Sequence, residues 1–190
     1  MMQCNPRPQL QTVKPLDLSV NNPEAWNILN HFIRTYQDGG DEALWQQLAA
    51  QPQWLNGQLI EVIEGSKDNP PWPQDDYGQT LYHLGNAYQR QAQLGESPSQ
   101  HRAWAAICYQ IALEIFRPQQ VPGDCLNIAL ALGDLGFEQG DWQMALDGYY
   151  LGIAAINHQR TQPLNLRAAQ DLLAKSLHIH NQAIQAALNL

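Results

Sequence analysis

The sequence predicts an all-α fold of about eight helices, paired antiparallel, on three observations. Apolar residues recur at spacings of three and four along most of the chain, which is the period of one helix face. Glycine and proline interrupt these stretches where helices would end. No stretch shows the alternation that marks a half-buried strand. A chain of 190 residues is long enough for one domain with a sizeable core.

The N-terminal part of the chain is expected to hold an arm and a helical leader. Residues 1–20 are polar and rich in proline, which indicates an extended arm. Residues 21–66 form the leader, with Asn22 as a helix cap and Pro23 as the first helical residue. The Asp-Gly-Gly sequence at residues 38–40 is expected to stop this first helix.

Local signals also predict the other two helices of the leader. Asp41 can cap the second helix, and Pro52 opens the third. Residues 65–73 contain three prolines, and we expect a loop there that is the clearest internal boundary. The third helix is expected to turn four apolar residues inward: Leu55, Leu59, Val62 and Ile63.

Long, alanine-rich amphipathic helices follow this loop. We expect them at residues 75–94, 98–117, 124–139, 141–158 and 162–188. The first four make two helix pairs within residues 72–158, and the fifth is a C-terminal capping helix within residues 160–190. Thr161 and Pro163 signal the start of that last helix. Its apolar stripe would cap the array or pair with a second copy: Leu166, Ala169, Leu173, Leu177, Ile184 and Leu188.

The two helix pairs share a repeated pattern of small and aromatic residues. Gly85 and Gly133 each follow a leucine in the first helix of a pair, 48 residues apart. In the second helix of each pair an alanine precedes Tyr109 or Tyr149 by four residues. Small residues let the helices approach closely, and the tyrosines fill the space around them. One pair cannot bury its own apolar face, so neighbouring pairs must stack.

This pattern resembles the tetratricopeptide repeat, and its long period resembles the arrays of bacterial CHAT-protease proteins, especially cyanobacterial ones. The run Leu-Gly-Asn-Ala-Tyr at residues 84–88 is similar to that family's motif, as is the second-helix run at residues 109–115. Trp-Pro at residues 72–73 and Val-Pro at residues 121–122 stand before the repeats, as in that family. The resemblance extends over residues 25–188 and implies a protein-interaction array.

The match to the repeat has three departures. Gly136 stands where an aromatic residue is usual, and Phe137 comes one position late. An insertion at residues 93–102 separates the helices of the first pair. The spacing of 48 residues exceeds the usual repeat length of about 34. An irregular helical bundle with small residues at chance positions is the alternative interpretation.

The resemblance also implies where a partner would bind, because the first helix of each pair lines the concave groove in such arrays. A mixed or apolar peptide fits this surface better than an acidic one, since Arg90 is its only cation and several would be needed to clamp a carboxylate. Alternatively, these side chains face solvent or pack on the leader. The expected groove residues are Gln79, Tyr82, Asn86, Gln89, Arg90, Asn127, Leu130, Asp134, Phe137 and Glu138.

Composition excludes several classes of function. Lys and Arg total 10 against 18 Asp and Glu, so the formal net charge is −8, which opposes nucleic-acid binding. No apolar run approaches the roughly 18 residues that a membrane span needs. The first residues lack the apolar core of a secretion signal. We therefore expect a cytoplasmic protein without nucleic-acid binding or membrane insertion.

No grouping of residues indicates catalysis, a cofactor or a metal. Cys4, Cys108 and Cys125 lack metal-ligand spacing. Cys125 sits at a helix start, where a thiol can be acidified, but its surroundings show no nucleophile motif. His178 and His180 lie two residues apart, so on a helix they point to different faces. We expect no enzyme activity, no cofactor and no metal ion.

Three functional hypotheses remain from the sequence. The first is an adaptor or scaffold that binds another protein or peptide through the groove. The second is an accessory or remnant subunit of a catalytic system, either CHAT-protease-like or of another kind. The third is a self-assembling helical protein that forms a homodimer through its last helix.

Overall fold

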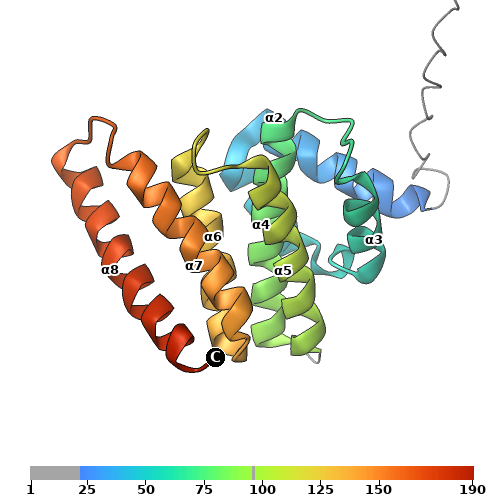
Figure 1. Cartoon of the computed structure of the whole chain (residues 1–190). Coiled ribbons are helices and arrows are strands. Elements are labelled where there is room, and N and C mark those ends of the chain that lie inside the picture. Colours follow the sequence, from blue (N-terminus) through green and yellow to red (C-terminus); the bar gives the residue numbers. More distant parts are fainter. Residues whose placement is uncertain (1–21, 96) are drawn as a thin grey trace, which may run out of the picture.

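The structure is a computed structural model that describes residues 22–95 and 97–190, and all regular secondary structure in these residues is helical (Figure 1). The all-α prediction is confirmed for this part of the chain, whereas the arm expected at residues 1–20 lies outside it. The described residues form seven α-helices and one short 3-10 helix. They are α2 (Pro23–Ala50), η1 (Pro52–Trp54), α3 (Gly57–Ser66), α4 (Gln74–Leu94), α5 (Pro98–Ile115), α6 (Pro122–Gln139), α7 (Trp142–Gln159) and α8 (Leu166–Leu188).

The long helices pack as consecutive antiparallel neighbours. In the pair α4–α5, Gly78 lies against Phe116, while the Tyr88 ring lies 5.5 Å from that of Trp104. The order of contacts therefore runs in opposite directions along the two helices. The pair α6–α7 stands beside α4–α5, joined through contacts of α5 with α6, and α8 packs on α7 (Figure 1).

Glycines set the close approach within each pair, as the sequence predicts. A Cβ atom on Gly133 would lie 2.5 Å from Cε1 of Tyr149, and one on Gly85 would collide with the Tyr109 ring. In α7, a Cβ atom on Gly148 would lie 2.5 Å from the backbone nitrogen of Gly133. Real Cβ contacts essentially never come so close, so these positions accept no larger residue without movement.

The stop predicted at residues 38–40 coincides with a kink at Gly40, where two helical stretches meet within α2. Asn22 caps α2 as expected, because its side chain accepts a hydrogen bond from the Ala25 backbone nitrogen at 3.2 Å. The helical path continues to Ala50 and is interrupted at Gly40, whose φ of 67° and ψ of −160° are not helical. Asp41 was expected to cap a second helix; its Oδ1 lies 3.0 Å from Nε2 of His83 on α4.

The third leader helix begins later than Pro52 predicts. Pro52 opens only the single turn η1, and Asn56 caps α3 by accepting from the backbone nitrogen of Leu59 at 3.2 Å. The helix also runs on to Ser66, so the expected loop is shortened at its start to residues 67–73. The inward positions are confirmed, since all four side chains are buried: Leu55, Leu59, Val62 and Ile63.

Aromatic and polar contacts attach the leader to α4. Trp72, just before α4, donates from Nε1 to Oδ1 of Asn30 on α2 at 2.7 Å. Its ring stacks on that of Tyr77 with 5.3 Å between the ring centroids. The Tyr77 hydroxyl lies 2.9 Å from Oγ of the buried Ser66 on α3. These contacts join α2, α3 and α4 at one end of α4.

The last helix begins later than predicted, and of the two roles expected for its apolar stripe, capping the array is contradicted. It begins at Leu166 instead of residue 162, because Asn165 supplies the cap by accepting from the Ala168 backbone nitrogen at 2.9 Å. Its buried face is not the predicted stripe, which stays largely exposed to solvent. The residues buried in α8 are instead Leu172, Ser176, Ile179, Ala183 and Ala186.

Candidate binding surface

The ten residues predicted to bind a partner lie on α4 and α6, and none of them is fully buried. Arg90, Asn127 and Glu138 are exposed, and the other seven are partly exposed. The structure therefore leaves each of these side chains accessible. The ten residues have two different surroundings. Tyr82, Asn86 and Arg90 on α4 line hollows together with residues of α2. Asn127 and Asp134 on α6 contact α8 instead.

A buried tyrosine fixes the amides on α4. The hydroxyl of Tyr109 lies 2.8 Å from Oδ1 of Asn86 and 3.1 Å from Oε1 of Gln89, and these two oxygens share its single hydrogen. Burial raises the pKa of Tyr109 well above its usual value, so the hydroxyl stays a donor. With both amide oxygens turned toward the tyrosine, their NH₂ groups are presented as donors. Such donors suit the carbonyl groups of an extended peptide.

The equivalent tyrosine of the second pair contacts an acid instead. The hydroxyl of Tyr149 donates to Oδ1 of Asp134 at 2.8 Å, and Nε2 of His178 on α8 lies 3.0 Å from the same oxygen. Burial, followed by the hydrogen bond to Asp134, raises the pKa of Tyr149. On the same helix, Oδ1 of Asn127 accepts from Nζ of Lys175 at 3.1 Å. Asn127 and Asp134 thus serve contacts with α8, which the sequence pattern did not predict.

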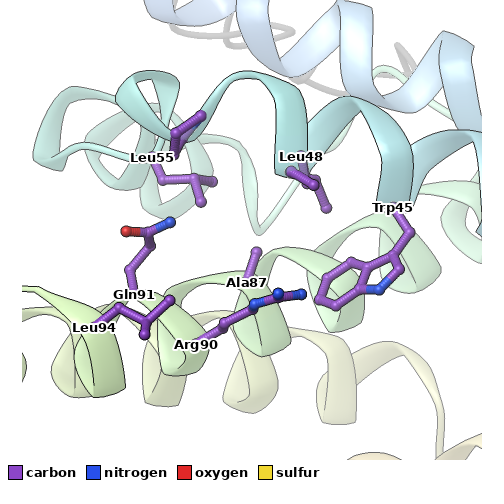
Figure 2. Close-up of a pocket in the computed structure, with 9 residues that line it drawn as sticks. Trp45, Leu48, Leu55, Ala87, Arg90, Gln91 and Leu94 are labelled. Atoms are coloured by element: carbon purple, nitrogen blue, oxygen red, sulfur yellow. The ribbon is translucent and has the colours of Figure 1, made fainter.

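An apolar cavity opens between the end of α2 and α4, beside the predicted residue Arg90 (Figure 2). Its volume is about 180 Å³. The buried residues Leu48, Leu55 and Ala87 form its apolar wall. At the mouth, the Arg90 side chain extends toward the Trp45 ring, and Leu94 stands 76% exposed (Figure 2).

A second hollow adjoins the first on the other side of Trp45. Asp41 and Glu42 from α2 line it together with Tyr82 and Asn86 from α4, and its volume is about 250 Å³. Trp45 lines both hollows. The surface is therefore bipolar, with carboxylates at one hollow and a guanidinium at the other.

The contribution of α2 to this surface was missed by sequence reasoning. The repeat pattern identifies positions on α4 and α6 but does not describe the leader. Trp45 gives a weak signal in the sequence, because its spacing groups it with Leu44 and Leu48 on the apolar face of its helix. Leu44 and Leu48 are buried, whereas Trp45 is only partly buried.

The two described cysteines are not poised for nucleophilic chemistry. Burial raises the pKa of the Cys108 thiol well above its usual value. A thiol at a helix start can be acidified, but burial and the adjacent Asp124 raise the pKa of Cys125 to about 11. Both side chains are fully buried. The thiolate form that attacks a substrate is therefore disfavoured at both sites.

The histidine pair diverges on α8. His178 faces Asp134, whereas Nδ1 of His180 lies 2.7 Å from the backbone oxygen of Ser176. Within residues 22–95 and 97–190, no three His, Cys, Asp or Glu side chains gather as a metal site would need.

Comparison of the chain with protein-family models, with curated proteins and with solved structures found no match. In the part of the chain that the structure describes, no helix combines the length and apolar character needed to cross a membrane.

Proposed function

We propose that this chain is a tetratricopeptide-type interaction module that binds a partner protein or peptide along α4. The observation that carries the proposal is the pair of hollows on either side of Trp45, next to Tyr82 and Arg90. Protein-binding hot spots are enriched in Trp, Tyr and Arg. Here one residue of each type borders the same accessible surface.

The chemistry of the two hollows defines the expected ligand. The cavity of about 180 Å³ suits one large apolar side chain, because an engineered cavity of about 150 Å³ in another protein holds benzene. Arg90 at its mouth favours a carboxylate or a backbone carbonyl on the neighbouring ligand residue. Asp41 and Glu42 favour a basic residue at the other hollow. The amide donors of Asn86 and Gln89 can bind the peptide backbone between them.

This ligand combines apolar, basic and polar groups. The mixed peptide expected from the sequence therefore fits the proposal, and a strongly acidic peptide does not. The groups on α6 contribute less, because Asn127 and Asp134 already contact α8. We accordingly place the binding site on α4 and α2, with Leu130, Phe137 and Glu138 of α6 outside its centre.

Affinity capture followed by mass spectrometry tests the proposal with two variants. Tyr82→Ala combined with Arg90→Ala is expected to abolish capture of a partner that the unmodified chain retains. The matched control combines Tyr150→Ala, an exposed tyrosine on α7, with Arg117→Ala after α5. Circular dichroism would verify that both variants keep their helix content.

The proposal fails if no captured protein depends on Tyr82 and Arg90. It also fails if the control variant loses the partner equally, because the recognition surface would then lie elsewhere. For an identified partner, a peptide scan should locate binding in a segment with one large apolar residue near a basic residue.

A further inference from the structure

A row of large apolar side chains on α8 faces solvent instead of the core. Leu166, Leu173, Leu177, Ile184 and Leu188 are between 55% and 81% exposed. The opposite part of the helix packs on α7, where Ile179 contacts Gly152. Terminal elements of stacked helical arrays normally need a polar outer face for solubility. The outer face of α8 is apolar, which indicates that another surface covers it.

We propose that this row, the α8 seam, pairs antiparallel with the α8 seam of a second copy of this chain. Four of the five seam residues follow heptad spacing: Leu166 and Leu173 occupy one core position, and Leu177 and Ile184 occupy the other. Heptad spacing is the pattern of helix-to-helix pairing, in contrast to the broader stripe that faces a globular core. The seam is separate from the α4 surface and its proposed partner.

The seam is complementary to itself, as a two-fold interface requires. In an antiparallel register centred on Lys175, Leu166 of one copy lies opposite Ile184 of the other. Leu173 then lies opposite Leu177, so the four residues at the two core positions pair with each other in both directions. Gln170 falls opposite His180, and the two-fold symmetry repeats this polar layer once on each side of the centre.

Charge also favours a second copy as the occupant. The seam residues are uncharged, and the charged residues of α8 are Arg167, Asp171 and Lys175. Lys175 is directed toward α6 and contacts both Asp171 and Asn127. Although the chain as a whole has a formal net charge of −8, α8 carries more basic than acidic residues. Pairing through α8 therefore brings together helices with one acidic residue each, Asp171, which Lys175 already neutralises.

The area of the seam is sufficient for a dimer of modest affinity. Each exposed Leu or Ile offers on the order of 100 Å² of apolar surface. The seam therefore amounts to about 500 Å² in each copy, or about 1,000 Å² in a pair, near the lower limit for a specific interface. We expect a reversible dimer whose population rises with protein concentration.

Sedimentation equilibrium of the full chain tests the dimer directly. The unmodified protein is expected to change from monomer to dimer with rising concentration. Leu173→Glu combined with Leu177→Glu should weaken the dimer at least tenfold, because four carboxylates would meet in the seam. Leu94→Glu introduces the same change at an exposed leucine on α4 and should leave the dimer unchanged. Gln170→Leu combined with His180→Leu should strengthen it, because the polar layers of the seam would become apolar.

Disulfide formation tests the register in a Cys4→Ser background, which removes the one cysteine outside the described residues. A mixture of Leu173→Cys and Leu177→Cys chains should give a disulfide-linked heterodimer faster than either variant alone. A monomer at every concentration would overturn the proposal, as would a dimer that survives the double glutamate variant. Preferential linkage of each cysteine variant to itself would overturn the antiparallel register.

Discussion

Single glycines decide how closely the helix pairs approach. Gly148 is the strictest example, because its missing Cβ would meet backbone atoms: the nitrogen of Gly133 at 2.5 Å and the oxygen of Ala129 at 2.8 Å. A flexible side chain could move aside, whereas these atoms belong to the hydrogen-bonded frame of α6. Glycine is therefore needed at position 148 for the close contact between α6 and α7, although its intrinsic helix propensity is poor.

We predict that Gly148→Ala destabilises the protein by about 2 kcal/mol. The collision should cost up to about 3 kcal/mol, and the better helix propensity of alanine returns about 0.5–1 kcal/mol of it. Urea unfolding followed by circular dichroism measures the difference. Gly123→Ala is the matched control in α6, where a Cβ would meet nothing within 4 Å, and it should stabilise the protein slightly. Equal effects of the two substitutions would contradict the close approach.

For single residues, the sequence predicts packing contacts more reliably than hydrogen-bond partners. The motif identified Gly85 and Gly133 as contact points, and both lie against the predicted tyrosines. It did not reveal that Tyr109 binds two amides while Tyr149 binds an acid shared with α8. Repeat spacing places a residue on a helix face, but a hydrogen-bond partner depends on rotamers and on the next element.

At the scale of elements, two glycines with positive φ shape helix ends and kinks differently. Gly140 has φ 70° and ψ 15°, the left-handed conformation of a helix C-cap. Its backbone nitrogen bonds the oxygen of Phe137, and Asp141 then caps α7. Gly40, inside α2, has φ 67° but ψ −160°. That combination is essentially restricted to glycine.

We therefore predict that asparagine is accepted at one of these positions and not at the other. Asparagine enters the left-handed region readily, so Gly140→Asn should change the unfolding free energy by less than about 1 kcal/mol. Gly40→Asn should cost about 1–3 kcal/mol, because asparagine gains nothing at that ψ. Urea unfolding of both variants provides the comparison. A Gly40→Asn protein as stable as Gly140→Asn would show that α2 does not need its kink.

The helices themselves were largely predictable, because periodicity and breakers act within a few residues. The helix ends were harder to predict where two possible start signals lie close together. Thr161 and Pro163 suggested the start of α8, but the cap belongs to Asn165. The apolar stripe of α8 was found from the sequence, which left open whether it would cap the array or pair with a second copy; the structure contradicts the first of these roles. The large leucines of α8 dominate its hydrophobic pattern, but its buried face includes smaller residues such as Ser176 and Ala183, which allow close packing.

For the whole molecule, the question is whether the leader and the helix pairs unfold together. One cluster of buried apolar residues extends from Leu29 in α2 through Leu81 and Leu132 to Ile179 in α8. Arrays of stacked helices can unfold in parts when neighbouring units are weakly coupled. Here contacts between α5 and α6 join the two pairs, and α2 and α3 pack on α4 and α5 respectively. Such continuity favours one cooperative transition.

Two spectroscopic probes distinguish these outcomes because the tryptophans are unevenly placed. Five of the six lie at or before Trp104, so fluorescence reports mainly on the leader, α4 and α5, whereas circular dichroism reports on every helix. We predict coincident urea transitions by both probes at one protein concentration. Ile179→Ala, a buried truncation in α8, should cost about 2–5 kcal/mol and lower both midpoints together. If α8 were an independent unit, that variant would move only the circular dichroism curve, since the fluorescence signal arises far from the substituted residue along the chain.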